Sequence, residues 1–372
     1  MAKRGRIALG MSGGVDSAVA AALLARDGWD VVGVTCLFQD TAEAHAAADD
    51  AAKVAARLGI EHVRADACAL FEQQVVGPFV CEYREGLTPS PCVGCNAHAK
   101  LPALIQAARE LGCDAWATGH YAHVVRMDAD GISVSNGASD RMDGNDADEG
   151  VRFAIRMATH AAKDQSYMLA QLKQEQLARL VLPLGAFTKP QVRDIAVELN
   201  LPVAHKSESQ DICFAPHGYR AFLAERGVKD APGPIVNEQG TVLGTHSGLS
   251  DYTIGQRKGI GIAAPEPYYV VGKRVERNEL VVGFASEART SAVRIGDLVW
   301  QSIPSLSQAL AARVKLRYRS TAATCIIEPA VQGDARVVLR EPQTLTAPGQ
   351  YAVLYDSDIV LGSGKILEVE RV

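Results

Sequence analysis

The chain lacks the features that mark a membrane or secreted protein. No apolar run within its 372 residues approaches the length of a membrane-spanning segment. The N-terminus is basic, but Gly10 and the triplet Ser12-Gly13-Gly14 interrupt the apolar stretch that follows, so we do not expect a signal peptide. These absences predict a soluble, cytoplasmic protein with no membrane partner. With 48% hydrophobic residues, the chain can bury a substantial core divided among two or three domains.

The sequence also lacks an excess of positive charge and a disulfide framework. The formal net charge is -5, which gives no support for nucleic-acid binding, so any RNA-binding surface must be local. There are eight cysteines, but a long chain without a signal peptide favours reduced, catalytic or metal-binding thiols. Only Cys92 and Cys95 stand at a spacing that has a meaning of its own.

The first half of the chain alternates short apolar runs with helical stretches. Strands are predicted at 6–9, 30–35, 60–65 and 115–118, and helices at 16–26, 42–58 and 101–111. This alternation predicts an α/β fold with a doubly wound parallel sheet covered on both faces. Asp, Gly, Ser and Asn dominate the stretch 127–150, which favours an exposed hairpin or loop.

The second half changes from helices to short β-type runs. Helices are predicted at 165–172 and 189–199, and Thr188 can cap the second. Beyond residue 207 the apolar runs lie at 268–271, 279–282, 312–318, 335–339 and 350–354. They predict a small central domain followed by a β-barrel or sandwich. We therefore expect a catalytic domain at 1–206, a central linking domain at 207–285 and a C-terminal β-barrel at 286–372.

A glycine-rich loop lies between the first predicted strand and the first helix. It reads S-G-G-V-D-S over residues 12–17. Glycines allow successive N–H groups to point at one anion, and a helix N-terminus adds its positive dipole end. Asp16 could help to hold a metal ion at the phosphates, or could cap the helix. The loop has no lysine of the Walker A type. It resembles the PP-loop of ATP pyrophosphatases, which implies that ATP is converted to AMP and pyrophosphate.

A C-x-x-C pair follows two prolines. The stretch 88–96 reads T-P-S-P-C-V-G-C-N, and the prolines are expected to hold it out of a helix. Such a pair can form a disulfide, bind zinc, hold part of an iron–sulfur cluster or act as a redox pair. No second pair stands at zinc-ribbon spacing. The nearest candidate partner is Cys213, which lies in a polar stretch unlike a core.

Together these segments resemble the bacterial tRNA-specific 2-thiouridylase family over nearly the whole chain. Beyond the two stretches already quoted, the matching segments are T-G-H-Y-A at 118–122, K-D-Q-S-Y at 163–167, the loop around Cys213, D-Y-T-I-G-Q-R-K-G at 251–259, Y-V-V-G-K at 269–273, R-Y-R at 317–319 and P-G-Q at 348–350. In this order and spacing they are highly specific. The resemblance implies a PP-loop domain of the adenine nucleotide alpha hydrolase type, a small central domain and a C-terminal β-barrel.

The resemblance also implies an activity and its site residues. The C2 oxygen of the wobble uridine, position 34, would be adenylated by ATP with Mg and then replaced by sulfur. The ATP-binding residues would be Gly10, Met11, Ser12, Gly13, Gly14, Val15, Asp16, Ser17, Cys36 and Gly119. Cys95 matches the nucleophile, and Cys213 matches the cysteine that carries a persulfide. The tRNA-binding residues would be Ser90, Pro91, Cys92, His120, Lys163, Asp164, Gln165, Arg317, Tyr318 and Gln350. The expected partners are tRNAs for Lys, Glu and Gln, and a cysteine desulfurase or sulfur-relay protein.

Two sulfur chemistries stay open at this point. Some members of the family have aspartate where this chain has Cys92. Cys92, Cys95 and Cys213 could therefore hold a 4Fe–4S cluster whose open iron carries hydrosulfide. Alternatively, Cys213 carries a persulfide, and attack by Cys95 leaves a disulfide bond.

One pattern predicts a local RNA-binding surface. Arg313, Lys315, Arg317 and Arg319 alternate with apolar residues, which on a strand would place four cations on one face. Two other classes of function compete with tRNA thiolation. One is a different PP-loop enzyme, such as an amide-forming ligase or a 4-thiouridine synthase. The other is an iron–sulfur RNA-binding or sensor protein that uses the loop only to bind a nucleotide.

Overall fold

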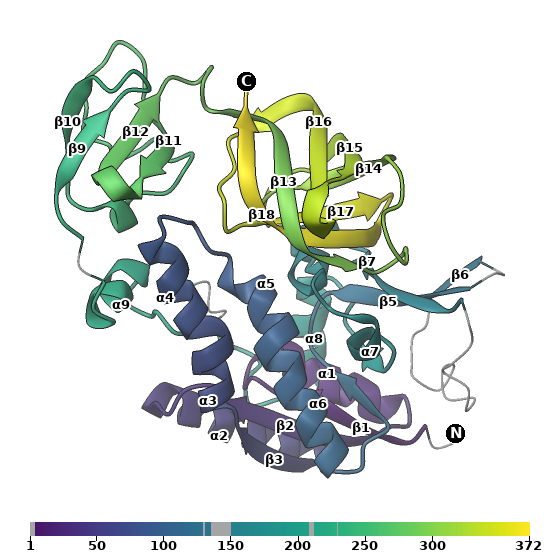
Figure 1. Cartoon of the computed structure of the whole chain (residues 1–372). Coiled ribbons are helices and arrows are strands. Elements are labelled where there is room, and N and C mark those ends of the chain that lie inside the picture. The colour runs from purple at the N-terminus through teal and green to yellow at the C-terminus, as the bar shows by residue number, and fades with distance from the viewer. Residues whose placement is uncertain (1–3, 129–130, 135–149, 208–211, 229) are drawn as a thin grey trace.

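The computed structural model describes residues 4–128, 131–134, 150–207, 212–228 and 230–372, and its strands form three sheets. A parallel sheet lies at the bottom of Figure 1, a small sheet at the upper left and a β-barrel at the upper right. The helices α4 and α5 lie between the parallel sheet and these two β units (Figure 1). None of the helices formed by the described residues combines the length and the apolar composition that are needed to cross a lipid bilayer.

Five parallel strands form the first sheet, in the order β3-β2-β1-β4-β8. Their bounds are β1 (Arg6–Gly10), β2 (Asp30–Leu37), β3 (Glu61–Asp66), β4 (Ala115–Ala117) and β8 (Leu180–Val181). Alternate residues of β1 face opposite layers: Ile7 and Leu9 pack with α1, α2 and α8, whereas Ala8 packs with α6. These helices are α1 (Val15–Arg26), α2 (Ala42–Leu58), α6 (Leu101–Glu110) and α8 (Lys189–Glu198). The predicted doubly wound parallel sheet is confirmed.

Local capping explains why two of these helices begin where the sequence predicts. The Thr41 hydroxyl accepts a hydrogen bond from Ala44 N at 3.2 Å, and Gly59 ends α2 with a φ of 68°. Thr188 caps α8 by accepting from Gln191 N at 3.3 Å. In return, Gln191 Oε1 accepts a hydrogen bond from Thr188 N at 2.8 Å, which completes a capping box.

Two irregular helical stretches connect the sheet to the β units. The first contains α3 (Cys68–Phe71), the π turn η1 (Glu72–Val76) and α4 (Gly77–Arg84). The second contains α5 (Pro91–Cys95) and the π turn η2 (Asn96–Lys100), which leads directly into α6. The expectation that prolines hold the C-x-x-C segment out of a helix is wrong. Pro91 occupies the first position of α5, where its missing N–H costs no hydrogen bond.

A β-hairpin follows the parallel strand β4. It pairs β5 (Ala122–Asp128) with β6 (Gly131–Val134) and β7 (Arg152–Met157). This agrees with a hairpin at the start of the stretch 127–150, of which 129–130 and 135–149 lie outside the described residues. The predicted helix at 165–172 is wrong, because this region forms only the short 3-10 turns η4 (Ala161–Lys163) and η5 (Ser166–Leu169) before α7 (Gln174–Leu177).

Four strands form the small central sheet, in the order β10-β9-β12-β11. They follow the helix α9 (Tyr219–Glu225), and their bounds are β9 (Gly233–Val236), β10 (Val242–His246), β11 (Tyr269–Arg274) and β12 (Glu279–Gly283), with 3-10 turns at η6 (Leu249–Asp251) and η7 (Val275–Arg277). The residues buried between these strands are mainly Ile, Val and Leu.

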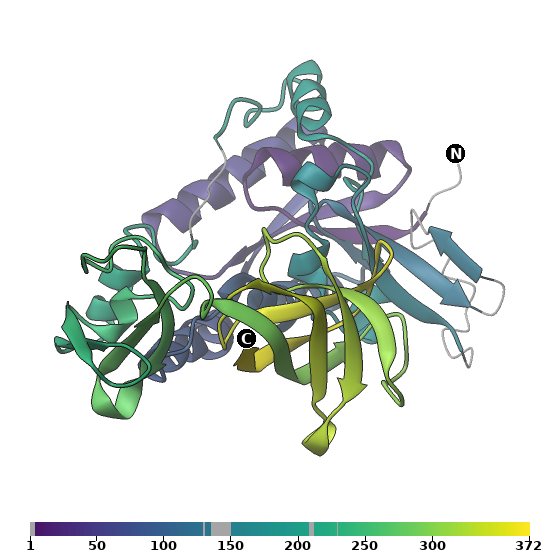
Figure 2. The ribbon, with the colours of Figure 1, turned by 90° about the horizontal axis from the view of Figure 1, so that it is seen from above.

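The C-terminal strands close into a barrel because β13 pairs with both β16 and β18. Its strands are β13 (Arg289–Trp300), β14 (Leu310–Lys315), β15 (Ala323–Pro329), β16 (Ala335–Thr344), β17 (Tyr351–Asp356) and β18 (Ile359–Arg371), with the 3-10 turn η8 (Val331–Gly333). The hairpin strand β7 extends the barrel sheet by pairing with β18, and Figure 2 shows the hairpin beside the barrel.

The predicted cationic strand at 312–318 is wrong in its extent. Strand β14 ends at Lys315, and the chain then turns, with Ser320 Oγ donating to Arg317 O at 2.8 Å. Arg317 and Arg319 therefore lie beyond the strand and do not share a strand face with Arg313.

A buried glutamine joins the barrel to the first half of the chain. Gln301 has no solvent exposure. Its Oε1 accepts from Ile155 N at 3.0 Å, and its Nε2 donates to the carbonyls of Leu169, Ala170 and Leu172 at 3.0, 3.2 and 3.2 Å. These bonds hold the segment 169–172 against the barrel, although the Leu169 carbonyl also accepts from Leu172 N and the Ala170 carbonyl from Ser363 Oγ.

We predict that Gln301→Leu destabilises the protein by about 3 kcal/mol, because it leaves the buried Ile155 N–H and the Leu172 carbonyl without their partner and removes the other bonds across the junction. The shift of the urea unfolding midpoint measures this loss. Gln343→Leu is the matched control, because Gln343 bonds only to the nearby Glu341 carbonyl at the surface. Equal midpoints for the two variants would contradict the prediction.

Candidate active site

The candidate site lies where the order of the parallel strands reverses. Strands β1 and β4 are neighbours, but the chain continues outward from β1 on one side and from β4 on the other. Ligands of open parallel sheets bind at such a point, beside the carboxyl ends of the strands. The loop 12–17 follows β1, and Gly119 follows β4. A Cβ on Gly119 would lie 3.0 Å from the backbone of Asp16 and Ser17, so the structure brings these two predicted segments together.

Close packing by α2 fixes the conformation of the loop. Gly13 has a φ of 67°, and a Cβ on it would lie 2.1 Å from the carbonyl oxygen of Ala47 in α2. Ser17 Oγ donates to Gly14 O at 3.2 Å and accepts from Ser12 N at the same distance. No side chain caps the N-terminus of α1. The loop therefore has a fixed backbone at the uncapped start of a helix of 12 residues, which is suited to binding an anion.

The Asp16 side chain does not cap the helix but is held by donors from other parts of the chain. Its Oδ1 accepts a hydrogen bond from the Tyr121 hydroxyl at 2.6 Å and from Lys189 Nζ at 2.7 Å. A second lysine contacts the loop itself, because Lys206 Nζ donates to Gly13 O at 3.0 Å. Sequence reasoning missed both lysines. Each is far from the loop along the chain, and no local pattern marks either as a phosphate ligand.

The predicted nucleotide contacts at β2 are placed beside the loop. Met11 N donates to Val34 O at 2.8 Å, and the Thr35 hydroxyl donates to Met11 O at the same distance. A Cβ on Gly33 would lie 2.4 Å from Met11 Sδ, so this glycine leaves room for the methionine. Cys36 lies near the end of β2, where burial raises the pKa of its thiol to about 11. The Cys36 thiol is therefore protonated at physiological pH.

Aromatic packing brings the Cys213 loop to the C-x-x-C helix. Phe214 packs against Phe79 with ring centroids 5.1 Å apart. Both rings belong to a buried cluster that also contains Cys95. Cys95 is only 4% exposed, whereas Cys92 and Cys213 are exposed. The structure therefore places the two predicted catalytic cysteines around one cluster, with one thiol buried and the other open to solvent.

The thiols of Cys92, Cys95 and Cys213 interact electrostatically with one another and with Lys100. Burial raises the pKa of Cys95 to about 12, and the positive charge of Lys100 opposes this rise. The charges of Cys213 and Cys92 raise the pKa of Cys95 further. Lys100 was also missed by sequence reasoning. It comes five residues after Cys95. At this spacing two side chains face different sides of an α-helix, but they face the same side in the wider π turn η2.

The thiols are not bonded to one another in this structure, where all eight cysteines are unpaired. Among the residues that the structure describes, no three His, Cys, Asp or Glu side chains lie close enough to hold a single metal ion together. The ligands of a 4Fe–4S cluster stand farther apart than those of a single ion, so a cluster on Cys92, Cys95 and Cys213 stays a prediction.

His120 lies next to the glycine that packs on the loop, and it also interacts with Lys100. It follows Gly119, and its Nδ1 lies 2.8 Å from the Thr118 hydroxyl oxygen. Desolvation, with a smaller contribution from the charge of Lys100, holds the pKa of His120 well below its usual range. The imidazole is therefore neutral at physiological pH and cannot supply a cation for RNA.

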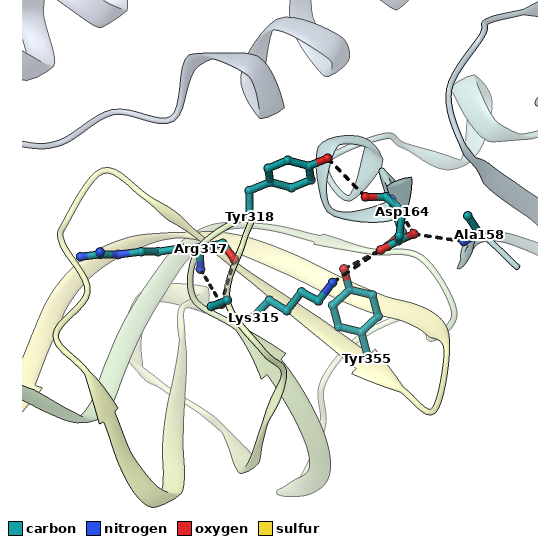
Figure 3. Close-up of polar contacts among 8 residues, drawn as sticks. Ala158, Asp164, Lys315, Arg317, Tyr318 and Tyr355 are labelled. Carbon is teal, nitrogen blue, oxygen red and sulfur yellow. Dashed lines mark hydrogen bonds and ion pairs between the residues drawn. The ribbon is translucent and has the colours of Figure 1, made fainter. Parts of the chain in front are cut away.

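Asp164 lies in a buried network between the barrel and the first half of the chain (Figure 3). Its Oδ1 accepts from Ala158 N at 3.0 Å and from Ser166 N at 3.2 Å. Its Oδ2 accepts from Ser166 Oγ at 2.8 Å and from Lys315 Nζ at 3.5 Å. The Tyr355 hydroxyl lies 3.1 Å from Ser166 Oγ. The carboxylate thus faces the junction with the barrel, where it positions the K-D-Q segment.

The neighbours of Asp164 are also engaged. Lys163 is half-buried. Gln165 forms two hydrogen bonds with Tyr121, both at 2.9 Å. Gln165 N donates to the Tyr121 carbonyl, and Tyr121 N donates to Gln165 Oε1. The Tyr318 hydroxyl donates to the Asp164 carbonyl at 3.4 Å. These contacts hold the segment 163–165 against residues beside the loop 12–17, called the phosphate loop below.

Two further predicted tRNA-binding residues join separate parts of the fold. Arg317 donates from Nη2 to the carbonyls of Ile254 at 3.1 Å and Leu345 at 2.6 Å, which connects the central domain to the barrel. Gln350 donates from Nε2 to the Thr88 carbonyl at 2.7 Å, which holds the segment before the C-x-x-C pair against the barrel.

Ser90 and Pro91 open onto a cavity of about 220 Å³. The cavity lies between α5 and the barrel, and its polar lining includes Glu82, His98, Asp297, Tyr351 and Lys365. Lys365 forms an ion pair with Glu82 at 2.8 Å within it.

Comparison with known proteins gives matches along nearly the whole chain. Three family models match in succession: the tRNA methyl transferase HUP domain at residues 5–217, the tRNA methyl transferase PRC-barrel domain at 220–284 and the aminomethyltransferase beta-barrel domain at 290–366. The tRNA-specific 2-thiouridylase MnmA of Carboxydothermus hydrogenoformans is 41% identical over 376 residues, which cover 98% of each chain. The enzyme of the same name from Heliobacterium modesticaldum is 39% identical over 97% of this chain and 92% of its own.

Among solved structures, a match is found to the U34-tRNA thiolase NcsA from Methanococcus maripaludis with its 4Fe–4S cluster. It is 20% identical, with a TM-score of 0.35, and the match covers 60% of this chain and 64% of that chain. A likeness at this level carries no argument about the function of the present chain.

We predict that iodoacetamide labels Cys95 far more slowly than Cys92 or Cys213. Cys95 is buried, and a pKa raised to about 12 makes its thiolate fraction at pH 8 on the order of a thousandfold smaller than that of an ordinary cysteine. Because the thiolate fraction grows as pH rises, labelling of Cys95 should accelerate up to pH 10. Peptide mass spectrometry of the native and the urea-unfolded protein measures these rates. Equal native rates at Cys95 and Cys92 would contradict the structure.

Proposed function

The chain belongs to the tRNA-specific 2-thiouridylase family, and on that premise we propose that it adenylates the C2 oxygen of the wobble uridine of tRNA and replaces it with sulfur. One observation supports this most directly. Gly119 packs on the phosphate loop, and the charge of Lys100 acts both on the next residue, His120, and on Cys95, so the segment Gly119-His120 is near both the loop and the thiols. An enzyme that activates uridine with ATP and then delivers sulfur needs these two chemistries side by side.

In the first step, the uridine C2 oxygen attacks the α-phosphorus of ATP. A bond forms between that oxygen and phosphorus, and the bond to the β-phosphate breaks, so pyrophosphate leaves with the electron pair. The N–H groups of the loop hold the departing phosphates, as the uncapped start of α1 allows. Mg²⁺ bound to ATP would neutralise phosphate charge. Asp16 suits this role because it is a carboxylate in the loop, held in place at Oδ1 by Tyr121 and Lys189.

In the second step, the terminal sulfur of a persulfide on Cys213 attacks C2, and AMP leaves. Cys95 then attacks the Cys213 sulfur, which releases 2-thiouridine and forms a disulfide bond between the two cysteines. An external thiol must reduce this disulfide before the next turnover. The exposure of Cys213 supports its loading by a cysteine desulfurase or a sulfur-relay protein.

We further propose that the anticodon loop of tRNAs for Lys, Glu or Gln docks across the three units 1–206, 207–285 and 286–372. The uridine must leave the base stack to reach the thiols, as recognition of single-stranded RNA usually requires. Four of the proposed tRNA-binding residues form contacts between these units: Asp164, Arg317, Tyr318 and Gln350. The others are Ser90, Pro91, Cys92, His120, Lys163 and Gln165.

We predict that Cys213→Ser abolishes thiolation but leaves tRNA-dependent release of pyrophosphate, because the loop and the first step do not use this thiol. Mass spectrometry of tRNA nucleosides and a pyrophosphate assay measure the two steps separately. Cys81→Ser is the control, because Cys81 is also exposed but lies in α4, outside the thiol group. Full thiolation by Cys213→Ser would refute the assigned role. An amide-forming enzyme would tolerate both substitutions.

We predict that protein purified without oxygen contains no stoichiometric iron or acid-labile sulfide, because the proposed persulfide route needs no cluster. Metal and sulfide analysis with a visible spectrum tests this, before and after attempted reconstitution. About four iron and four sulfide per chain, lost in Cys92→Ala, would replace the persulfide route with delivery through a cluster.

A further inference from the structure

We propose that Lys206 binds the β- and γ-phosphates of ATP and thereby supplies the positive charge that the phosphate loop itself lacks. This inference rests on the proposed adenylation activity. The sequence 12–17 contains no lysine or arginine, although a departing pyrophosphate carries several negative charges. Beside the Mg²⁺ that ATP brings, a cation from elsewhere in the fold can meet this need, and the structure places Lys206 at the loop.

The position of Lys206 is fixed by two hydrogen bonds. Its Nζ donates to the carbonyl of Gly13 at 3.0 Å and to Asp50 Oδ2 at 2.8 Å. An ammonium group has three hydrogens, so it can keep both bonds and still donate to a phosphate oxygen. The side chain is 39% exposed, so a ligand in solution can reach it.

Asp50 acts as the counterion that keeps Lys206 beside the loop. It lies in α2, three residues after Ala47, the residue whose carbonyl packs on Gly13. Hydrogen bonds from Lys206 and from Lys53 hold the pKa of Asp50 below its usual value, so the carboxylate stays ionised at physiological pH. The helix that shapes the loop therefore also places the lysine.

Lys189 has a different role at the same site. It bonds to the carboxylate of Asp16, which is part of α1, and its side chain is only 11% exposed. Lys206 also pairs with a carboxylate, but Lys189 is far less exposed to a ligand in solution, so we assign Lys189 to the positioning of Asp16. Lys206 instead bonds to the loop backbone at Gly13, the point where the phosphates are expected to lie.

The chemical consequence concerns the leaving group. When the bond between the α-phosphorus and the bridging oxygen breaks, its electron pair adds negative charge to pyrophosphate. A charge-assisted hydrogen bond from Lys206 stabilises that charge in both bound ATP and the transition state. AMP has no β-phosphate, so the contact is absent from the AMP complex.

The test compares the affinities of ATP, pyrophosphate and AMP for Lys206→Ala and wild-type protein by isothermal titration calorimetry. We expect the affinities for ATP and pyrophosphate to fall at least about tenfold, and the AMP affinity to stay within about twofold. Lys53→Ala is the matched control. Lys53 binds the same carboxylate, Asp50, at 3.1 Å but does not contact the loop, so its loss should leave all three affinities unchanged.

Each alternative outcome can be distinguished. Equal losses of ATP and AMP affinity, or no loss for either, would overturn the role of Lys206 in phosphate binding. If Lys206→Ala does not fold, Lys206→Arg and Lys206→Gln replace it, and only the arginine variant should retain ATP affinity. A wild-type protein that binds neither ATP nor pyrophosphate would refute the proposed adenylation itself. Normal ATP affinity in wild type and in Lys206→Ala would refute the lysine assignment alone.

Discussion

The packing of α2 on the phosphate loop is the constraint on which the arrangement of the site depends. The Ala47 carbonyl lies where a Cβ of Gly13 would be, so the loop can carry no side chain there. A loop built so tightly can offer N–H groups but little charge of its own. The charged groups around it come from distant parts of the chain: Lys189 begins α8, and Lys206 follows that helix. The fold thus places around the loop the positively charged side chains that the loop itself lacks.

The junction between the barrel and the first half of the chain depends on polar groups. A buried carboxylate such as Asp164 is costly to desolvate unless donors surround it, and four donors do so here. Gln301 is satisfied in the same way on the other side of the junction. Two apolar surfaces can pack in several relative positions, whereas each of these hydrogen bonds forms only at one position of the barrel relative to the first half of the chain. The junction therefore fixes where the barrel stands relative to the thiols.

The sequence predicted the features that depend on local chemistry. Helix α2 begins and ends as predicted because Thr41 caps it and Gly59 adopts a left-handed conformation, and the phosphate loop follows β1 as its glycines indicate. Features that depend on distant contacts were missed. Lys206 is held beside the loop by Asp50, which is far away along the chain. Helical periodicity assumes α geometry, so the π turn that returns Lys100 toward the thiols is invisible to it.

The burial of Cys95 agrees with the proposed order of sulfur transfer. A thiol whose pKa is raised to about 12 is a poor nucleophile toward oxidants and stray electrophiles in solution. In the proposed mechanism Cys95 is needed only after sulfur has bonded to C2, when the Cys213 sulfur is held next to it. At that stage proximity replaces intrinsic reactivity, and the charge of Lys100 favours the thiolate. An exposed, readily ionised Cys95 would instead attack the persulfide on Cys213 before any uridine was activated, and the sulfur would be lost.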